Sequence, residues 1–519
     1  MDANVGHPRR WQILGVMVFS LLAVVLDNTI LNVAIKTIAD PVHGLGASQS
    51  QLEWAMNSYT LVFAGLLFTF GVLGDRFGRK RMLLFGMVLF GLASVASAYA
   101  QDPGQLIGAR ALMGLGGAAI MPATLAIISN VFPIQERGRA IGIWAAGVGI
   151  AVAIGPITGG LLLEHFWWGS VFLVNVPIVV LAIVLNVTIV PDSKDPNHTK
   201  LDPVGVLLSI LGLVSLVYGI VRVSDLGTVA DVSVIVPSLI GLAILGGFVW
   251  YESRIEHPAF DVRNFRKAGF STAIAAVGLT FFAAMGMMFF MAFYWQIVRG
   301  FTPLQSGALV LPFAAAQLIF APQSAKMVQK YGAKAVGTVA MLIVALALGA
   351  YAFVQVDTAV WVLLLLGFVQ GAAMANLLPP ATTAIMNSLP REKAGVGSSM
   401  SNVVRQVGGT LGIAALGAIL SAVYQNGMED KLRGLPPQVA QIANESISGA
   451  AGVAEHLGAQ GTALLRAADE SFVNGMHWSA VIASLIALAG VFVMARWMPG
   501  KIAASTVPVR EKETASSVS

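Results

Sequence analysis

One carboxylate, Asp27, lies deep inside a long apolar stretch, in the segment LDNTILNVAI (26–35). None of the other 25 acidic residues lies as deep: they fall in loops or near the ends of apolar stretches. An ionised carboxylate in a membrane costs about 2.5–3.5 kcal/mol even on the lower insertion scales, and such acids are usually functional. Because desolvation favours the neutral form, we expect Asp27 to exchange a proton. The alternative is a structural carboxylate that stays permanently paired.

Two arginines also lie within apolar stretches. Arg110 keeps its proton in a protein and therefore needs a carboxylate, a carbonyl or water. It could tune the protonation of a nearby acid or carry a water chain, or it could simply clamp two helices. Arg405 shares a helix face with Asn402 and Gln406 at i, i+3 and i+4 and has no acid in its own helix. Its partner could be a substrate, a backbone carbonyl or Asp27.

Other polar and aromatic side chains at membrane depth are candidates for a substrate pocket. Asn28 and Asn32 fall with Asp27 within an arc of about 140° on a helix, so this stripe must face the protein interior. The segment AAMGMMFFMAFYWQ (283–296) offers a flexible wall that suits apolar ligands, or it is ordinary core or lipid-facing filler. The predicted pocket residues are Asn28, Asn32, Asn57, Tyr294, Trp295, Gln296, Gln317, Gln370, Asn376, Asn402, Arg405 and Gln406.

The composition requires these residues to be held by membrane-spanning helices. The 519 residues are 56% hydrophobic and 11% charged, whereas soluble proteins carry about 25% charged residues. There is no cysteine, which excludes disulfides and cysteine metal sites, and we expect no metal. A span needs about 20 helical residues. Fourteen stretches qualify: 12–35, 52–73, 82–100, 104–131, 139–163, 169–190, 203–221, 233–251, 270–297, 304–325, 334–354, 359–386, 396–424 and 476–497.

The basic residues orient these helices. If the N-terminus is cytoplasmic, 23 of the 31 Lys and Arg fall in inner segments, six fall in outer segments and two lie within spans. Basic residues concentrate on the cytoplasmic side of membrane proteins. We therefore expect both termini in the cytoplasm.

An internal repeat divides the chain. GVLGDRFGRK (71–80) is similar to AKMVQKYGAK (325–334), and PATLAI (122–127) is similar to PATTAI (380–385), at nearly one offset. A duplicated bundle is typical of transporters. The expected parts are a cytoplasmic N-terminus (1–11), a six-helix bundle (12–190), an inserted two-helix hairpin (203–251), a second six-helix bundle (270–497) and a disordered cytoplasmic tail (498–519). Within the second bundle, 425–475 is an extracytoplasmic loop that forms either a short helical hairpin or a loosely ordered segment.

Two segments suggest conformational roles. The tight turn GDRFGRKR places Asp75 beside basic residues, which predicts an ion-pair latch, or only an orientation signal. Gln329 replaces this Asp in the second copy, so a symmetric latch is not expected. Span 139–163 is rich in glycine, which permits close helix packing, and Pro156 should kink it.

These segments together resemble the major facilitator superfamily, and specifically its fourteen-span drug:proton antiporter family, over nearly the whole chain. GDRFGRKR follows the family pattern G-x-x-x-D-R-x-G-R-[RK], GPITGG (155–160) follows G-P-x-x-G-G, and LDNTILNVA follows L-D-x-T-x-x-N-V-A. RQVGGTLG (405–412) is similar to the corresponding segment of this family. Position 151, where the family usually has glycine, is Ala151.

The resemblance implies an all-α fold of two six-helix bundles plus two extra helices, with alternating access and proton coupling. Asp27 and Arg110 would couple protons. The conformational latch would comprise Gly71, Asp75, Arg76, Gly78 and Arg79, and the antiporter-motif helix would carry Gly155, Pro156, Gly159 and Gly160. We expect the latter helix at the interface between the bundles.

The leading hypothesis is a proton-driven exporter of amphipathic small molecules in the bacterial inner membrane. Some family members carry extra acids in spans 10 or 13, and this chain has none there, which weakens a dication substrate. The alternatives are a dedicated exporter of one metabolite, lipid or self-made antibiotic, and a sensor without flux. The chain has no HExxH, GxSxG or Walker sequence, so we expect no enzyme and no ATP-driven pump. We also expect a monomer without a cofactor or a nucleic-acid partner.

Overall fold

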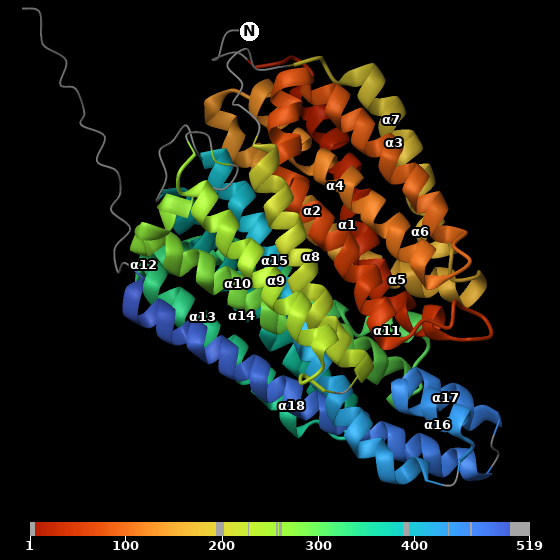
Figure 1. The fold of residues 1–519 in the computed structure, drawn as a ribbon. Helices are drawn as coiled ribbons and strands as arrows, with labels where there is room; N and C mark the ends of the chain where they lie inside the picture. Colours follow the sequence, from red (N-terminus) through yellow and green to blue (C-terminus); the bar gives the residue numbers. More distant parts are fainter. Residues whose placement is uncertain are drawn as a thin grey trace, which may run out of the picture.

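The computed structural model describes residues 6–193, 202–226, 228–255, 258, 262–387, 394–433, 435–456 and 459–498. Within these ranges the chain is helical and has no β-strand, in agreement with the expected all-α class. The two halves of the sequence form two helical bundles that lie side by side (Figure 1).

The helices follow the expected stretches closely. The first bundle contains α1 (Arg10–Ala39), α2 (Gln49–Phe77), α3 (Arg79–Ala98), α4 (Pro103–Val131), α5 (Ile134–His165), α6 (Ser170–Leu173) and α7 (Asn175–Ile189). The inserted pair is α8 (Pro203–Leu226) and α9 (Val232–Glu252). The second bundle contains η1 (Val262–Arg266), α10 (Ala268–Phe293), η2 (Tyr294–Val298), α11 (Pro303–Ala308), α12 (Leu311–Tyr331), α13 (Ala333–Ala350), η3 (Tyr351–Phe353), α14 (Val360–Asn387), α15 (Ala394–Met428), η5 (Glu429–Leu432), α16 (Pro437–Glu445), α17 (Ile447–His456) and α18 (Ala459–Trp497).

Each of the fourteen predicted stretches falls on one helix or on two consecutive helical segments. Twelve helical segments in the described residues are long and apolar enough to cross a membrane, and α2 and α5 are not among them. The structure therefore supports a multi-pass membrane fold but does not confirm the count of fourteen spans.

Local sequence explains where several helices begin. Ser48 and Gln51 form a reciprocal capping box at the start of α2, and Thr302 and Gln305 do the same for α11. The Asp102 side chain accepts from the Gln105 amide at the start of α4. These polar caps satisfy backbone amides that the first turn of a helix leaves without partners.

The predicted repeat has a structural counterpart in two turns. Gly78 joins α2 to α3 with φ of 114°, and Gly332 joins α12 to α13 with φ of 83°. Positive φ favours glycine, which lacks a Cβ. Pro122 and Pro380, the first residues of the second repeated pair, lie inside α4 and α14. Corresponding positions of the two halves thus adopt the same local conformation.

The last helix is longer than the sequence predicts. It begins at Ala459 rather than 476 and has 39 residues, or about 58 Å at 1.5 Å per residue. Together with α15 it extends past the bundles and carries the short helices α16 and α17 at one end of the molecule (Figure 1). We call this end the hairpin side, and the opposite end, where the turn at Gly78 lies, the basic-loop side.

The inserted pair lies against both bundles. Helix α8 packs on α2 of the first bundle and on α15 of the second, while α9 packs on α8 (Figure 1). Leu61, Val217, Val221 and Ala414 form one buried apolar cluster at this three-helix contact. The pair therefore covers the seam between α2 and α15 along one side of the molecule.

Candidate functional site

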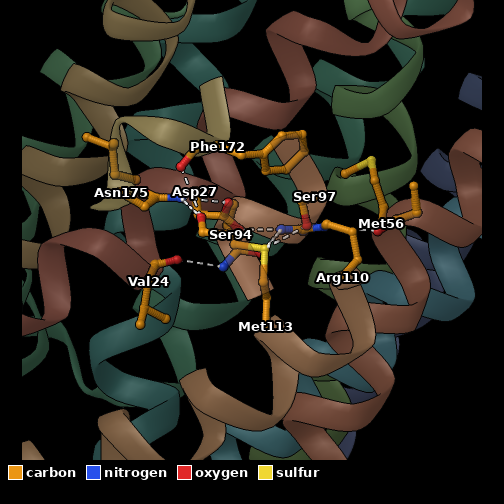
Figure 2. Close-up of polar contacts among 12 residues, drawn as sticks. Val24, Asp27, Met56, Ser94, Ser97, Arg110, Met113, Phe172 and Asn175 are labelled. Carbon is orange, nitrogen blue, oxygen red and sulfur yellow. Dashed lines mark hydrogen bonds and ion pairs between the residues drawn. The ribbon is translucent and has the colours of Figure 1, made fainter. Parts of the chain in front are cut away.

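Asp27 and Arg110 form a buried ion pair inside the first bundle. Asp27 lies on α1 and Arg110 on α4, each about 1% exposed, and Arg110 Nη1 donates to Asp27 Oδ2 (Figure 2). Each charge compensates the desolvation of the other, which a buried ion requires. The structure thus brings together the acid and the arginine that the sequence singled out separately.

The remaining contacts of Arg110 fix its position. Its Nε donates to the Ala55 carbonyl at 3.1 Å, and its guanidinium lies over the Tyr59 ring at 4.5 Å. A cation over an aromatic ring is stabilised by the ring quadrupole, more strongly where water is excluded. Both partners are on α2, so Arg110 links α1, α2 and α4.

Asp27 has a second donor that sequence reasoning missed. Asn175 Nδ2 lies 3.1 Å from Asp27 Oδ1 and 3.1 Å from Ser94 Oγ, and Ser94 Oγ donates to the Phe172 carbonyl at 3.0 Å (Figure 2). The sequence feature that could have identified Asn175 is its polar side chain within the apolar stretch 169–190. A second such residue, Asn186, donates to Ser20 Oγ at 2.9 Å. Polar side chains of α7 therefore anchor α1 at Asp27 and Ser20, on the same face of α1 that Arg110 contacts.

The neighbouring asparagines of α1 make no described hydrogen bond to Asp27 or to Arg110. Asn28 Nδ2 donates to the Val24 carbonyl at 2.9 Å and Asn32 Nδ2 to the Asn28 carbonyl at 3.2 Å, and both are half-buried. In this conformation Asp27 lies in a closed polar cluster. Proton exchange at Asp27 therefore requires a rearrangement that lets water reach the carboxylate.

Helix η2 meets α1 near the hairpin side. Lys36 Nζ donates to the Gln296 carbonyl at 2.8 Å, and Gln296 Nε2 donates to the Val33 carbonyl at 2.9 Å. Tyr294 is fully buried and its hydroxyl donates to the Gln355 carbonyl at 2.7 Å; Trp295 is also buried. The predicted pocket residues Tyr294, Trp295 and Gln296 are therefore all buried in this structure. Gln296 bridges the two bundles.

The glycine-rich helix α5 also lies at the bundle interface. A Cβ at Gly160 would lie 2.7 Å from Leu304 N and 2.9 Å from the Pro303 carbonyl on α11. A Cβ at Gly307 would lie 2.7 Å from the Pro156 carbonyl carbon. Gly155 and Gly159 face Thr29 and Ile30 of α1 instead. The motif glycines thus permit close backbone contact both within the first bundle and across to the second.

The basic turn packs onto its own bundle. Arg79 N donates to the Ser193 carbonyl at 2.9 Å and its Nη1 to the Ala126 carbonyl at 3.4 Å. Arg76 is exposed, and Gly71 lies near Pro122 of α4. The side chain of Asp75 is not among those described, so the predicted ion-pair latch stays a prediction.

The other predicted pocket residues are spread over four helices. Asn57 on α2 is fully buried, and neither of its side-chain polar atoms has a described hydrogen-bond partner. Gln370 is buried, and Asn376 Nδ2 donates to the Ala372 carbonyl at 2.9 Å. The half-buried members of the set are Asn376 on α14, Gln317 on α12, and Asn402, Arg405 and Gln406 on α15. No described hydrogen bond connects these residues to the Asp27–Arg110 pair, and the sharing of one pocket stays a prediction.

A further buried acid, Glu53, lies one turn before Asn57 on α2 and is 0% exposed. Gln49 Nε2 donates to its Oε1 at 3.3 Å, and a Cβ at Gly417 of α15 would lie 2.8 Å from its Cδ. The burial of Glu53 could not be predicted from the sequence. Glu53 lies near the end of a predicted span, where burial depends on the packing of the opposing bundle. Among the described residues, no group of three His, Asp or Glu side chains could hold a metal ion.

Comparison with known proteins gives consistent matches over most of the chain. A model described as the Major Facilitator Superfamily matches residues 17–413. The chain is 34% identical over 490 residues to the multidrug efflux pump LfrA of Mycolicibacterium smegmatis, covering 94% of this chain and 96% of that protein. It is 34% identical to the methyl viologen resistance protein SmvA of Salmonella typhimurium, covering 92% and 94%, and 30% identical to the tetracenomycin C resistance and export protein of Streptomyces glaucescens, covering 93% and 91%.

The fold is similar to that of solved transporters. A bacterial homolog of the human lysosomal transporter Spinster, in an inward-facing and unoccupied conformation, superimposes with a TM-score of 0.67 at 18% identity. The superposition covers 95% of this chain and 98% of the other. At this identity the likeness concerns the fold alone.

Proposed function

The chain belongs to the major facilitator superfamily, and on that premise we propose that it is a proton-coupled antiporter that exports amphipathic small molecules across the bacterial inner membrane. As a member of this superfamily it is a membrane transporter and not an enzyme. Relatives named for multidrug efflux and for drug resistance and export support the drug-export role. The observation that carries proton coupling is the buried Asp27–Arg110 pair within membrane helices.

The chemistry of this pair suits proton exchange. Arg110 stays protonated, so Asp27 is the member that can gain or lose a proton. With Asp27 ionised, the Arg110 and Asn175 hydrogen bonds hold α4 and α7 against α1. Protonation of Asp27 removes its charge and weakens both contacts, which frees α1 to move relative to these helices. The proton state of one side chain would thereby bias the packing of the first bundle.

The contacts between bundles supply the other half of the cycle. The described polar contacts between α1 and η2, and the glycine contacts between α5 and α11, close the hairpin side. Positive residues concentrate toward the opposite side, so we assign the hairpin side to the extracytoplasmic space and both termini to the cytoplasm. Rocking of the bundles about a central site would then alternate access between the two sides.

Transport by purified protein in vesicles with an imposed pH gradient tests this proposal. The expected result is gradient-dependent accumulation of the dye rhodamine 123 by the wild type, and its loss on collapse of the gradient. Accumulation without a gradient contradicts proton coupling. Full gradient-driven accumulation by Asp27→Asn contradicts the role of this carboxylate.

A second candidate function is export of a single compound made by the cell itself. The similarity to a tetracenomycin C resistance and export protein favours it, because that relative is named for one substrate. A panel of unrelated dyes and antibiotics distinguishes the two functions. Transport of several unrelated compounds supports multidrug export, and transport of a single structural class supports a dedicated exporter.

A further inference from the structure

Arg405 is the intramembrane cation that the mechanism above does not use. It lies on α15, eleven residues from the start of the helix at Ala394 and well within its length. Asp27, one of the partners that the sequence left open for Arg405, is instead paired with Arg110. Among the described residues, Arg405 has no carboxylate partner.

The contacts of Arg405 leave most of its hydrogen-bonding capacity unused. A guanidinium carries five N–H donors. Nη1 lies 3.4 Å from Asn402 Oδ1, which is a weak contact, and Nε is buried with no hydrogen-bond partner in the described part of the chain. An unpaired cation at membrane depth is costly and usually marks a functional site. Arg110, by contrast, has a carboxylate, a carbonyl and an aromatic ring as partners.

The surroundings of Arg405 add an aromatic surface. The guanidinium carbon lies 4.7 Å from the centre of the Phe281 ring on α10. This close approach of α15 to α10 depends on glycine: a Cβ at Gly408 would lie 2.5 Å from the Gly278 carbonyl, and one at Gly409 would lie 3.0 Å from Met285 Cγ. The half-buried guanidinium therefore stacks on a ring while its planar edge keeps free donors. Such an edge matches a carboxylate with two parallel hydrogen bonds.

We propose that Arg405, supported by Phe281 and Asn402, binds the anionic group of amphipathic substrates, so that aromatic compounds with a carboxylate or an ionised phenol are preferred. This inference rests on the proposed export function and adds a substrate class to it. A permanently cationic group of a substrate, placed beside Arg405, would be repelled by the guanidinium charge, which no described carboxylate neutralises. The absence of acids from the predicted spans 10 and 13 agrees with a site that does not select cations.

The test uses two dyes that differ at one group. Rhodamine 110 carries a free carboxylate, and rhodamine 123 is its methyl ester. Initial transport rates give KM and kcat for each dye in vesicles that contain the wild type or Arg405→Met. A charge-assisted bidentate contact predicts a KM for rhodamine 110 that is about 10-fold higher or more in the variant. The KM for rhodamine 123 should change by less than about twofold.

Two further variants separate binding from a structural role. Arg405→Lys keeps the charge but loses the planar fork, and it should give an intermediate KM for rhodamine 110. Arg466→Gln removes an exposed arginine from α18 and should leave both dyes unaffected. Equal loss of transport for both dyes in Arg405→Met and Arg405→Lys, or no change for either dye, overturns the proposal.

Failure of the Arg405 inference can be distinguished from failure of the export proposal. If the wild type accumulates neither dye, the export function is wrong for these compounds, and fluorescence polarisation of each dye with purified protein decides the Arg405 inference. Selective loss of rhodamine 110 binding in Arg405→Met supports it, and unchanged or equally reduced binding of both dyes overturns it. If Arg405→Met does not fold, the same comparison is made with Arg405→Lys.

Discussion

The Lys36 ammonium of α1 donates to the Gln296 carbonyl of η2 at 2.8 Å, across 260 residues of sequence and between the two bundles. Gln296 returns a hydrogen bond from its side chain to the Val33 carbonyl at 2.9 Å. The two contacts form a reciprocal clasp. The hydrogen bond from the Lys36 ammonium to the Gln296 carbonyl has a charged donor, which makes it stronger than a hydrogen bond between neutral groups.

Lys36→Met should weaken this clasp and shift the protein toward a conformation open on the hairpin side. The chain has no cysteine, so a single Ser421→Cys substitution on α15 provides a clean reporter. We expect a membrane-impermeant maleimide, added from the hairpin side, to label it several-fold faster in the Lys36→Met background. Lys431→Met removes a half-exposed lysine of the same side and is the matched control. Equal labelling in the Lys36→Met and wild-type backgrounds would show that the clasp does not limit opening.

Gly307→Ala should impair closure of the hairpin side, because the new Cβ would lie 2.7 Å from the Pro156 carbonyl carbon and backbone atoms have little freedom to move away. We expect a transport rate at least about tenfold lower and faster labelling of the same cysteine reporter. Gly246→Ala on α9 is the control, because nothing lies within 4 Å of its Cβ position. Normal transport by Gly307→Ala would contradict a closure role for the α5–α11 contact.

Asp27→Asn should abolish accumulation driven by a pH gradient and retain exchange of internal for external dye. The amide cannot exchange a proton but keeps the size of the carboxylate and an acceptor for Arg110. Removing one charge of a buried pair costs about 3–5 kcal/mol, so we also expect a lower thermal unfolding temperature. Dye counterflow without a gradient measures the retained exchange. Loss of both activities in a correctly folded variant would indicate a role in substrate binding or packing instead.

Asn175→Leu should destabilise the protein by about 1–3 kcal/mol, because Asp27 Oδ1 and Ser94 Oγ each lose a buried partner. Gradient-driven transport should fall with it, since Asn175 donates a hydrogen bond to Asp27, the carboxylate that we propose couples protons. The exposed Asn474, changed to Leu on α18, is the control. Thermal unfolding followed in detergent gives the comparison, and equal unfolding temperatures for the two variants would count against the contribution of this contact.

Much of the helical architecture could be predicted from the sequence. In a membrane every backbone N–H and C=O must be hydrogen-bonded within the protein, so a long apolar stretch is expected to form a helix. The stretches 104–131 and 233–251 correspond to α4 and α9 to within one residue at each end. The predicted span 476–497 lies within α18, but the helix begins 17 residues earlier, at Ala459. This first part is too polar to resemble a span, yet it is helical because it packs against α17 and the end of α15.

The sequence also indicated that Asp27 and Arg110 each need a polar partner, because each is a charged side chain within a long apolar stretch. Their pairing could not be predicted, because 83 residues separate them and only the packing of α4 against α1 brings them together. The same holds for Asn175, 148 residues from Asp27, and for Glu53, whose burial depends on Gly417 of the other bundle.

The sequence by itself determined which residues enter the membrane, because that depends on hydropathy along the chain. Only the tertiary structure decided which of these residues meet. Among the described residues, it left Arg405 against an aromatic ring without a carboxylate, gave Asp27 two side-chain partners, and made Gln296 a bridge between bundles. The physical reason is that a helix presents its polar groups in fixed directions, whereas the neighbour in each direction depends on how all the helices pack.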